Sequence, residues 1–313
     1  MLIYRTKLGE AYCGDSLDLI RELEDNSVDL IVTSPPFALQ RKKSYGNVDQ
    51  EEYVDWLAQF GELAYSKLKD TGSLVIDIGS AYNKGEPTYS LYQFRVLLKF
   101  CDVLGYKLAQ PFYWHNTSAL PAPIEWVNKR KIRAKNSVNT VWWFSKTSNP
   151  KADVTKVLTP YSDRMKKLLD KPEDFFTEGA VRPSGHTHGK SWCNNNGGAI
   201  PPNVLMIPNS ESNSQYLRAC KTVGIKGHPA RFPQGIPEFF IKFLTDEGDL
   251  VVDIFGGSGT TGMACENLGR KWKTFELSRE YVAASSFRFI GSVEDSKDMY
   301  EKLLNNTETV YIG

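Results

Sequence analysis

The apolar run at residues 28–32 is followed directly by Thr33-Ser34-Pro35-Pro36-Phe37, and this junction constrains the fold more than any other feature of the chain. The apolar run predicts a buried strand. Proline fixes φ and lacks an N–H donor, so two consecutive prolines must end that strand in a stiff loop. We expect the loop either to hold a small polar group in one orientation or to be an ordinary turn around a buried Phe37.

Short apolar segments alternate with helical patterns through the first half of the chain. We predict strands at 11–13, 29–32, 73–78, 109–114 and 140–144, and helices at 16–23, 50–68 and 89–103. This alternation is typical of a parallel sheet with helices on both faces. The last two strands have no clear helix between them, which predicts an antiparallel edge.

The pattern breaks after residue 147 and returns near residue 233. Pro, Asn, Gly and Ser accumulate between these points, and we predict only one short helix there, at 162–169. The stretch is too long for a connecting loop, so we expect an inserted domain or ordered loops, with disorder as the alternative for 176–198. Beyond it we predict helices at 236–244, 262–268 and 280–290 and strands at 250–255 and 271–275. The predicted organisation is 1–147, an insertion at 148–226, and 227–313.

Composition narrows the class of protein. The chain has 313 residues, 41% of them hydrophobic and 24% charged, which is ordinary for a globular protein. No apolar run approaches the ~18 residues that span a bilayer, and residues 1–10 lack a signal-peptide core, so we expect a cytosolic protein. The five cysteines form no C-x-x-C pair, and Cys193 with the nearby His186 and His188 matches no standard metal pattern. We therefore expect no metal.

Charge is distributed unevenly. Residues 126–167 contain eleven Lys and Arg against Asp153 and Asp163, a net charge of +9 in a chain whose total is +1. The rest of the chain is therefore at −8. A basic block in an acidic chain indicates a surface for a polyanion, with a solvated helical face as the alternative.

A glycine-rich segment, residues 253–262 (DIFGGSGTTG), directly follows the apolar residues 250–252. A strand, a glycine turn and a helix in this order allow close approach to a ligand, and the helix start favours an anion. Glu276 ends the next predicted strand, where doubly wound folds hold a ribose hydroxyl. No Lys follows the glycines, which argues against ATP hydrolysis. The spacing of Gly257, Gly259 and Gly262 leaves NAD open as an alternative.

The two loops together resemble those of the S-adenosylmethionine-dependent DNA amino-methyltransferases. Their order, with the proline loop first and the glycine loop after an insertion, is similar to that of the circularly permuted β group. Ser34 in the first place of the proline motif is typical of cytosine-N4 enzymes, whereas Asp or Asn is commoner in adenine-N6 enzymes. Further similar segments lie at 12–16, 39–43, 123–130, 139–144, 228–233 and 275–277.

The resemblance implies an α/β fold with a doubly wound, mostly parallel, Rossmann-like sheet and an inserted target-recognition region. It implies a pocket for S-adenosyl-L-methionine in which Asp15 accepts from the adenine amino group and Glu276 binds the ribose. The helix that begins at Thr260 and Thr261 would face the methionine carboxylate. The full set of implied cofactor residues is Asp15, His228, Pro229, Ala230, Asp253, Phe255, Gly256, Gly257, Ser258, Gly259, Thr260, Thr261, Glu276 and Leu277. His228 could instead be a capping or turn residue.

The chemistry of an amino group explains the proline loop. The lone pair of cytosine N4 is delocalised into the ring, so two acceptors on its hydrogens would aim it at an electrophilic methyl group. The Ser34 hydroxyl and the Pro35 carbonyl can accept in this way, Pro36 stiffens the loop, and Phe37 can stack on the base. Asp77, near the end of a predicted strand, could take the proton or simply bind backbone. No cysteine follows a proline, which argues against transfer to cytosine C5.

A base in a duplex must be flipped out to reach such a loop, and flipping needs anchored phosphates. We expect these contacts from Arg41, Lys42, Lys43, Lys129, Arg130, Lys131, Arg133 and Lys135. The expected partner is double-stranded DNA in the bacterial cytoplasm, at the nucleoid, with no membrane and no metal. A cognate restriction endonuclease would share the site without binding, and the protein would be a monomer or weak homodimer. Adenine-N6 transfer and an inactive DNA-binding regulator remain alternatives.

Overall fold

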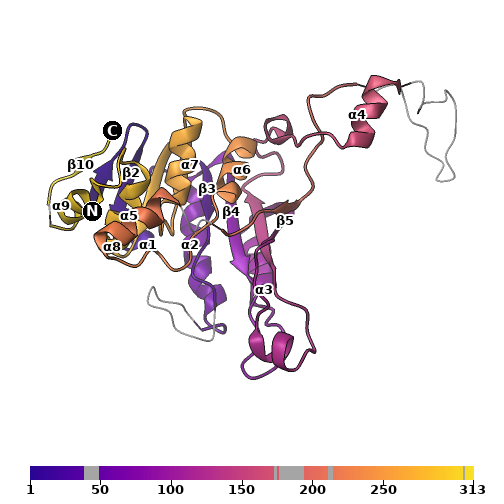
Figure 1. Ribbon diagram of the computed structural model, residues 1–313, viewed down its shortest axis with the longest axis horizontal. Helices are drawn as coiled ribbons and strands as arrows, with labels where there is room; N and C mark the ends of the chain where they lie inside the picture. The colour runs from indigo at the N-terminus through magenta and orange to yellow at the C-terminus, as the bar shows by residue number, and fades with distance from the viewer. Residues whose placement is uncertain (39–48, 173–174, 176–193, 211–213, 306) are drawn as a thin grey trace. The chain divides into compact units, whose positions relative to one another are not determined.

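A computed structural model describes residues 1–38, 49–172, 175, 194–210, 214–305 and 307–313 of the chain (Figure 1). The chain forms two compact units. One contains residues 1–152 and 203–313, and the other contains residues 153–202. Arg41, Lys42 and Lys43 lie outside the described residues, so their predicted role in DNA binding stays a prediction.

The larger unit is built on one mixed sheet. Among the described residues it has ten strands in the order β10-β1-β2-β9-β8-β3-β4-β6-β5-β7. Five neighbouring strands, from β2 to β4, are mutually parallel. The strands are β1 Leu2–Arg5, β2 Gly9–Cys13, β3 Val28–Thr33, β4 Leu68–Gly79, β5 Lys107–His115, β6 Val138–Ser145, β7 Val204–Met206, β8 Leu250–Asp253, β9 Lys271–Glu276 and β10 Val310–Tyr311.

The predicted antiparallel pair is β5 and β6. Strand β6 runs antiparallel to both β4 and β5, so β5 has the same direction as β4. Strand β7, which the sequence did not predict, lies parallel to β5 as the outermost strand. At the other side β1 is antiparallel to β2 and parallel to β10. The carboxyl ends of β3, β4, β5, β8 and β9 therefore share one edge of the sheet.

In the middle of the sheet, a strand that precedes the insertion pairs with a strand that follows it. Strands β3 and β8 are direct neighbours, with Leu30 opposite Val251 and Ile31 opposite Val252. The proline loop after β3 and the glycine loop after β8 are thus adjacent, although more than 200 residues separate them. This neighbourhood confirms the predicted permuted sheet, because one sheet is completed by segments on both sides of the insertion.

The helices form two groups. In the first half α1 Ser16–Arg21, α2 Tyr53–Lys67 and α3 Tyr92–Leu98 pack on a core that includes Leu57, Phe100 and Phe144. Predicted helix 89–103 starts at Tyr92 and changes to a π-helical turn, η1 Lys99–Val103. The second half contributes α5 Gln215–Val223, α6 Gly235–Leu244, α7 Thr260–Leu268, α8 Arg279–Ser285, η6 Ser286–Arg288 and α9 Ser296–Asn305. The sequence did not predict α5 or α9.

Local signals set the ends of several of these helices. Asp15 caps α1 by accepting from Leu17 N, and Ser214 caps α5 in the same way. Gly224 ends α5 with a left-handed φ of 81°. None of the helices within the described ranges is long and apolar enough to cross a membrane.

The smaller unit contains η3 Val154–Val157 and α4 Asp163–Asp170, close to the predicted helix at 162–169. Ser162 caps α4 by accepting from Met165 N. The unit falls inside the predicted insertion at 148–226, whereas β7 and α5 of that range belong to the larger unit. The role of the insertion in target recognition stays a prediction.

Candidate active site

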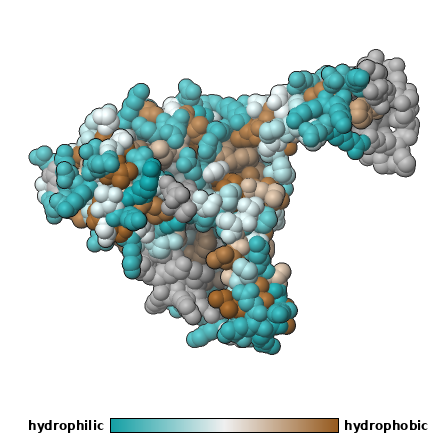
Figure 2. All heavy atoms as spheres, viewed as in Figure 1, coloured by the Kyte–Doolittle hydropathy of each residue, from teal (hydrophilic) through white to brown (hydrophobic). Residues whose placement is uncertain are grey.

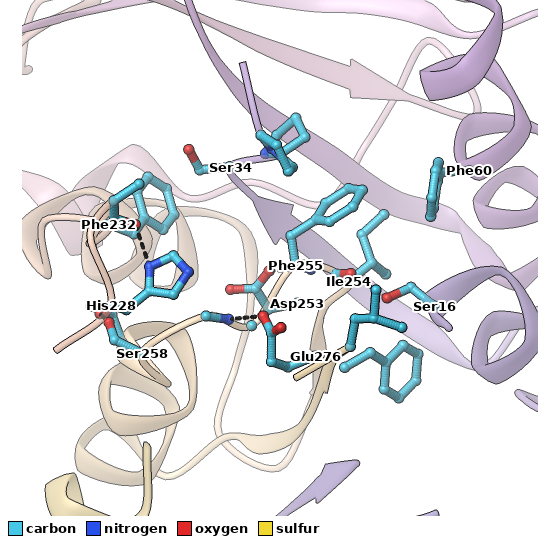
Figure 3. A pocket seen from close by; sticks show the side chains of 18 of the residues that line it. Ser16, Ser34, Phe60, His228, Phe232, Asp253, Ile254, Phe255, Ser258 and Glu276 are labelled. Atoms are coloured by element: carbon cyan, nitrogen blue, oxygen red, sulfur yellow. Dashed lines mark hydrogen bonds between the residues drawn. The ribbon is translucent and has the colours of Figure 1, made fainter. Parts of the chain in front are cut away.

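A cavity of about 450 Å³ opens at the carboxyl edge of the sheet, where β3 and β8 are neighbours. A volume of this size suits a nucleoside-sized ligand. Figure 3 shows Asp253 and Glu276 near its centre, with His228 and Phe232 to one side and Phe60 to the other. The lining residues are Asp15, Ser16, Leu17, Ser34, Pro35, Pro36, Phe37, Trp56, Phe60, His228, Ala230, Phe232, Asp253, Ile254, Phe255, Gly256, Gly257, Ser258, Thr260, Phe275, Glu276 and Leu277.

The glycine loop forms one wall of the cavity and leads into α7. Gly257 and Gly259 have φ of 49° and 71°, a region that favours glycine. A Cβ on Gly257 would lie 3.3 Å from the His228 ring, and one on Gly259 would lie 2.8 Å from the Ser285 Cβ. The loop therefore presents bare backbone to the cavity, as a closely held ligand requires.

Asp253 holds this loop in place. Its carboxylate accepts from the Thr33 hydroxyl at 2.7 Å, from the Thr261 hydroxyl at 2.5 Å and from Phe255 N at 3.1 Å. Burial raises the pKa of Asp253, and these hydrogen bonds partly oppose that effect. The side chain thus joins β3, β8 and the start of α7, so its contribution to a ligand site is to shape it.

Glu276 faces the cavity from the end of β9. One carboxylate oxygen accepts from Gly257 N at 3.0 Å (Figure 3). The other accepts from Ser278 N at 2.9 Å. Burial raises the pKa of Glu276, and the backbone hydrogen bonds lower it in part. Each oxygen can accept a second hydrogen bond, so the group can receive a pair of hydroxyls from a ligand.

The cavity rim next to Glu276 is formed by Asp15 and Leu277. Asp15 is exposed, and its capping hydrogen bond to Leu17 N, 2.8 Å long, fixes the carboxylate at the start of α1. Leu277 is 72% exposed at the rim, which is unusual for a leucine and leaves its side chain available to a ligand. The two residues offer an acceptor and an apolar contact side by side.

The opposite side carries His228. The residue is buried, and its Nδ1 lies 3.0 Å from the carbonyl oxygen of Ala230. Burial lowers the pKa of His228 to about 4, so the ring is neutral near pH 7. Ala230 and Phe232 also line the cavity, whereas Pro229 is not among the lining residues.

The first turn of α7 is more inward-facing than expected. Thr260 lines the cavity, but its hydroxyl lies 3.1 Å from that of Ser258, and the Thr261 hydroxyl is bound to Asp253. Arg288 donates to both Ser258 O and Ser258 Oγ, which fixes this turn from behind. Gly259 and Thr261 shape the loop without lining the cavity.

Ser34 connects the cavity to a buried carboxylate. Its hydroxyl donates to Asp77 Oδ2 at 3.0 Å, and Asn139 Nδ2 donates to Asp77 Oδ1 at 3.0 Å. Asp77 is only 1% exposed. Burial raises the pKa of Asp77 to about 7, although both hydrogen bonds favour its ionised form. A carboxylate with this pKa can take up and release a proton near neutral pH.

Phe37 is held against the backbone at the end of β4. A Cβ on Gly79 would lie 2.5 Å from the Phe37 ring, so only glycine fits at that position. Tyr92 donates its hydroxyl hydrogen to the Gly79 carbonyl. Pro35, Pro36 and Phe37 all line the cavity next to Ser34. The proline loop is thereby fixed at both ends.

An aromatic wall completes the cavity. Phe255 lies 4.9 Å from Phe60 and 5.7 Å from Trp56, measured between ring centroids. Trp56 and Phe60 lie within the predicted helix at 50–68, but nothing in the sequence indicated that they line the site. Sequence reasoning also missed Ser16, Leu17, Phe232, Ile254 and Phe275 as lining residues.

The predicted DNA-binding residues of the β5–β6 connection are all exposed. Lys129 forms an ion pair with Glu125 at 3.2 Å, and Arg130 stacks over the Trp126 ring. Arg133 donates to Pro87 O and Lys135 to Ala119 O. Lys131 lies between Arg130 and Arg133 in the sequence. Within the described ranges, no group of three or more His, Cys, Asp or Glu is placed to hold a metal ion.

Comparison with known proteins identifies the family. The family model described as DNA methylase matches residues 28–287, which include both loops and the insertion. The chain belongs to the DNA methylase family. Members of this family depend on S-adenosyl-L-methionine, and the bare glycine backbone and Glu276 fit that cofactor.

Two comparisons, one with a sequence and one with a solved structure, place this methylase more closely. The chain is 59% identical over 305 residues to the type II methyltransferase M.PvuII of Proteus hauseri, covering 96% of this chain and 90% of the relative. The solved structure of the PvuII DNA methyltransferase, described as cytosine-N4-specific, superimposes with a TM-score of 0.81 and 51% identity over 99% of this chain and 97% of that chain.

A more distant structure shows how far the fold extends. The putative DNA modification methylase TTHA0409 from Thermus thermophilus, solved in complex with S-adenosyl-L-methionine, matches with a TM-score of 0.53 at 18% identity, covering 97% of this chain and 99% of that chain. At this identity the likeness concerns the fold alone. The permuted sheet of this methylase is thus shared by proteins of widely different sequence.

Proposed function

We propose that this methylase transfers a methyl group from S-adenosyl-L-methionine to N4 of a flipped cytosine in double-stranded DNA, as the modification enzyme of a type II restriction–modification system. The observation that carries the proposal is the position of Ser34. Its hydroxyl lines the same cavity as Glu276 and is hydrogen-bonded to Asp77. The relative at 59% identity is named as a type II methyltransferase, which supports the biological role.

The cofactor would lie along the glycine loop. Glu276 would accept from the ribose hydroxyls, Asp15 from the adenine amino group, and Leu277 with Phe255 would contact the adenine ring. The backbone around Gly257 and the start of α7 would receive the methionine end, with neutral His228 beside it. When bound, the cofactor supplies an electrophilic methyl group on sulfur.

The target amine would be oriented by the proline loop. The Ser34 hydroxyl oxygen and the Pro35 carbonyl would accept the two amino hydrogens, and Phe37 would support the face of the base. Accepting both hydrogens turns the nitrogen lone pair towards the methyl group, which is catalysis by orientation and electrostatics. Because Ser34 donates its own hydrogen to Asp77, its oxygen is free to accept from the amine.

A proton must leave the nitrogen during transfer, and Asp77 would receive it through Ser34. With its pKa raised to about 7, the ionised carboxylate can accept a proton at neutral pH and return it to solvent afterwards. Asp77 would therefore act through Ser34 rather than on the base itself.

The remaining proposals concern DNA and the cell. The exposed basic residues between β5 and β6 would hold phosphates, and the insertion would read bases. The enzyme would act in the bacterial cytoplasm, at the nucleoid, as a monomer or weak homodimer. A restriction endonuclease of the same system would share the DNA site without binding the methylase.

Product analysis tests the proposal directly. Genomic DNA treated with the protein and S-adenosyl-L-methionine should contain N4-methylcytosine by nucleoside mass spectrometry, and modified-base sequencing should place it at one recognition site. N6-methyladenine as the sole product would assign the chain to the adenine branch. Tight DNA binding with no methylated product would indicate an inactive regulator.

A further inference from the structure

The connection between β5 and β6, residues 116–137, displays the aliphatic side chains of Leu120, Ile124 and Ile132 to solvent, and Ile132, at 41%, is the least exposed of the three. Leu120 is 81% exposed and Ile124 is 62% exposed. In Figure 1 the connection, drawn in magenta, extends away from the sheet, and Figure 2 shows brown side chains among teal ones in this part of the protein. Exposure of this degree within one short segment needs an explanation.

Hydrogen bonds within the segment hold its backbone in a defined structure. Asn116 N donates to Ser137 O at 2.8 Å, and Asn136 N donates to Ala122 O at 3.0 Å. The Asn128 side chain donates to Pro121 O, and Lys135 Nζ donates to Ala119 O, both at 3.0 Å. These bonds close the segment around residues 119–122. Leu120 and Ile124 are therefore presented outward by a defined backbone.

The segment lies at the same edge of the sheet as the reactive loop. Strand β5 has the direction of β4, so its carboxyl end at His115 is on the Ser34 side. Asn136 Nδ2 donates to Ser80 Oγ at 2.8 Å, which fixes the segment to the residue after Gly79. Gly79 in turn supports the Phe37 ring. The segment that carries Leu120 and Ile124 and the proline loop are thus both held by the end of β4, at Gly79 and Ser80.

Charge indicates what this surface meets. Residues 116–137 contain five Lys and Arg and a single acid, Glu125, which is paired with Lys129. An apolar tip surrounded by cations suits a polyanion that also has an apolar interior, and the stacked bases of a DNA duplex have both features.

We propose that Leu120 and Ile124 enter the DNA duplex at the target site and occupy the stack beside the flipped base. This inference rests on the proposed function, because it explains how the duplex would be opened for Ser34. Extrusion of a base costs unstacking and unpairing energy and leaves an apolar gap. Aliphatic side chains that fill such a gap are a known way for proteins to hold unstacked DNA.

The test compares two synthetic duplexes that contain the recognition site mapped by sequencing. In one the target cytosine is paired with guanine, and in the other it lies opposite adenine in a less stable mismatch. The double variant Leu120→Ser/Ile124→Ser should lose about tenfold in kcat/KM on the paired duplex, with a several-fold smaller loss on the mismatched one, where the opening cost is lower. Val103→Ser, 65% exposed at the opposite end of β5, is the matched control and should behave as wild type on both duplexes.

The possible outcomes distinguish a failure of this inference from a failure of the proposed function. If the wild type makes no N4-methylcytosine in either duplex, the proposed function fails. If the wild type is active but the double variant loses kcat/KM equally on both duplexes, or on neither, the proposed insertion of Leu120 and Ile124 into the duplex is wrong. Sedimentation that shows a dimer in the wild type and a monomer in the double variant would assign the surface to a second copy of the chain and would also overturn the proposal. Equal melting temperatures would exclude a folding defect.

Discussion

The Ser34 hydroxyl and the Asp77 carboxylate meet at 3.0 Å because β3 and β4 are adjacent parallel strands in register. Thr33, the last residue of β3, is paired with Ile76, so Ser34, the first residue after β3, comes next to Asp77 of β4. The serine and its acceptor are thus positioned by the sheet, and the prolines keep the rest of the loop from moving the hydroxyl away.

Ser34→Ala should slow methyl transfer while the binding of DNA and of S-adenosyl-L-methionine persists. The variant loses the acceptor for one amino hydrogen and the link to Asp77, which should lower kcat by about a hundredfold, as loss of one oriented group does in other enzymes. Single-turnover transfer measures the rate, and titrations with DNA and with S-adenosyl-L-methionine measure binding. Ser66→Ala, an exposed hydroxyl on α2 that donates to Leu63 O, is the control. A wild-type rate in Ser34→Ala would remove Ser34 from the mechanism.

The pH dependence of transfer should report Asp77. Only the ionised carboxylate can accept a proton, so kcat/KM should rise with pH and level off above about 7, the pKa to which burial raises this group. Asn139→Leu removes the donor to Asp77 Oδ1 and should move the midpoint upward by roughly one pH unit, since a hydrogen bond to a charged group is worth ~1.5 kcal/mol or more.

The control for this shift is Asn305→Leu, whose side chain donates to Glu301 O on α9. Its pH profile should match that of the wild type. An unchanged midpoint in Asn139→Leu would mean that another group limits the rate, and a downward shift would contradict the assigned direction of the hydrogen bond.

The sequence predicted the parts of the site that leave a local signature. Prolines after an apolar run and glycines before a helix have few other uses, and Asp77 was conspicuous in an apolar strand. Trp56 and Phe60 were not found, because a helical stripe of aromatic residues looks the same whether it faces a core or a cavity. Asn139 was missed because its partner is 62 positions away, a pairing that only the register of β6 with β4 establishes. Strand β7 is three residues long and too short to show a period.

The ionised form of Asp77, which is the form that accepts a proton, should lower the free energy of unfolding. A carboxyl whose folded pKa is raised above its unfolded value stabilises the fold at low pH and loses that stability as pH rises through the folded pKa, here from about 4 to about 7. Asp77→Asn keeps the shape without the buried charge. It should raise the free energy of unfolding in urea at pH 8, by an amount on the order of 4 kcal/mol at most, and should remove the loss of stability between about pH 4 and pH 7 that comes from Asp77.

Asp25→Asn is the contrasting variant for this measurement. Asp25 pairs with Lys67 at 2.6 Å, and that hydrogen bond lowers the pKa of Asp25. Its loss should bring no gain at pH 8. Equal stability of Asp77→Asn and the wild type at pH 8 would show that Asp77 is not ionised at a cost in the folded protein.

Glu276 and Asp253 should separate ligand binding from folding. Glu276→Gln loses one acceptor, so it should weaken S-adenosyl-L-methionine binding by about tenfold by calorimetry. One backbone N–H also loses its acceptor, but Glu276 is only partly buried, so the melting temperature should fall less than in Asp253→Asn. Asp253→Asn keeps one acceptor oxygen, which can stay on the Thr33 hydroxyl and Phe255 N, but it loses the acceptor for the buried Thr261 hydroxyl, so it should lower stability by about 1–3 kcal/mol. If Glu276→Gln binds normally, the ribose contact assigned to Glu276 is wrong.

The basic connection between β5 and β6 should be visible in the salt dependence of DNA binding. Each phosphate contact contributes about 0.9 to the slope of log K against log salt concentration, so Lys131→Gln should reduce that slope by about one. The loss should be similar on specific and random duplexes, because phosphates carry no sequence information. Lys7 is an exposed lysine that precedes β2 at the amino edge of the sheet. Lys7→Gln removes one positive charge, as Lys131→Gln does, and should leave the slope unchanged. Equal reductions in both variants would mean that the slope reflects total charge, and the phosphate contact assigned to Lys131 would then have to be withdrawn.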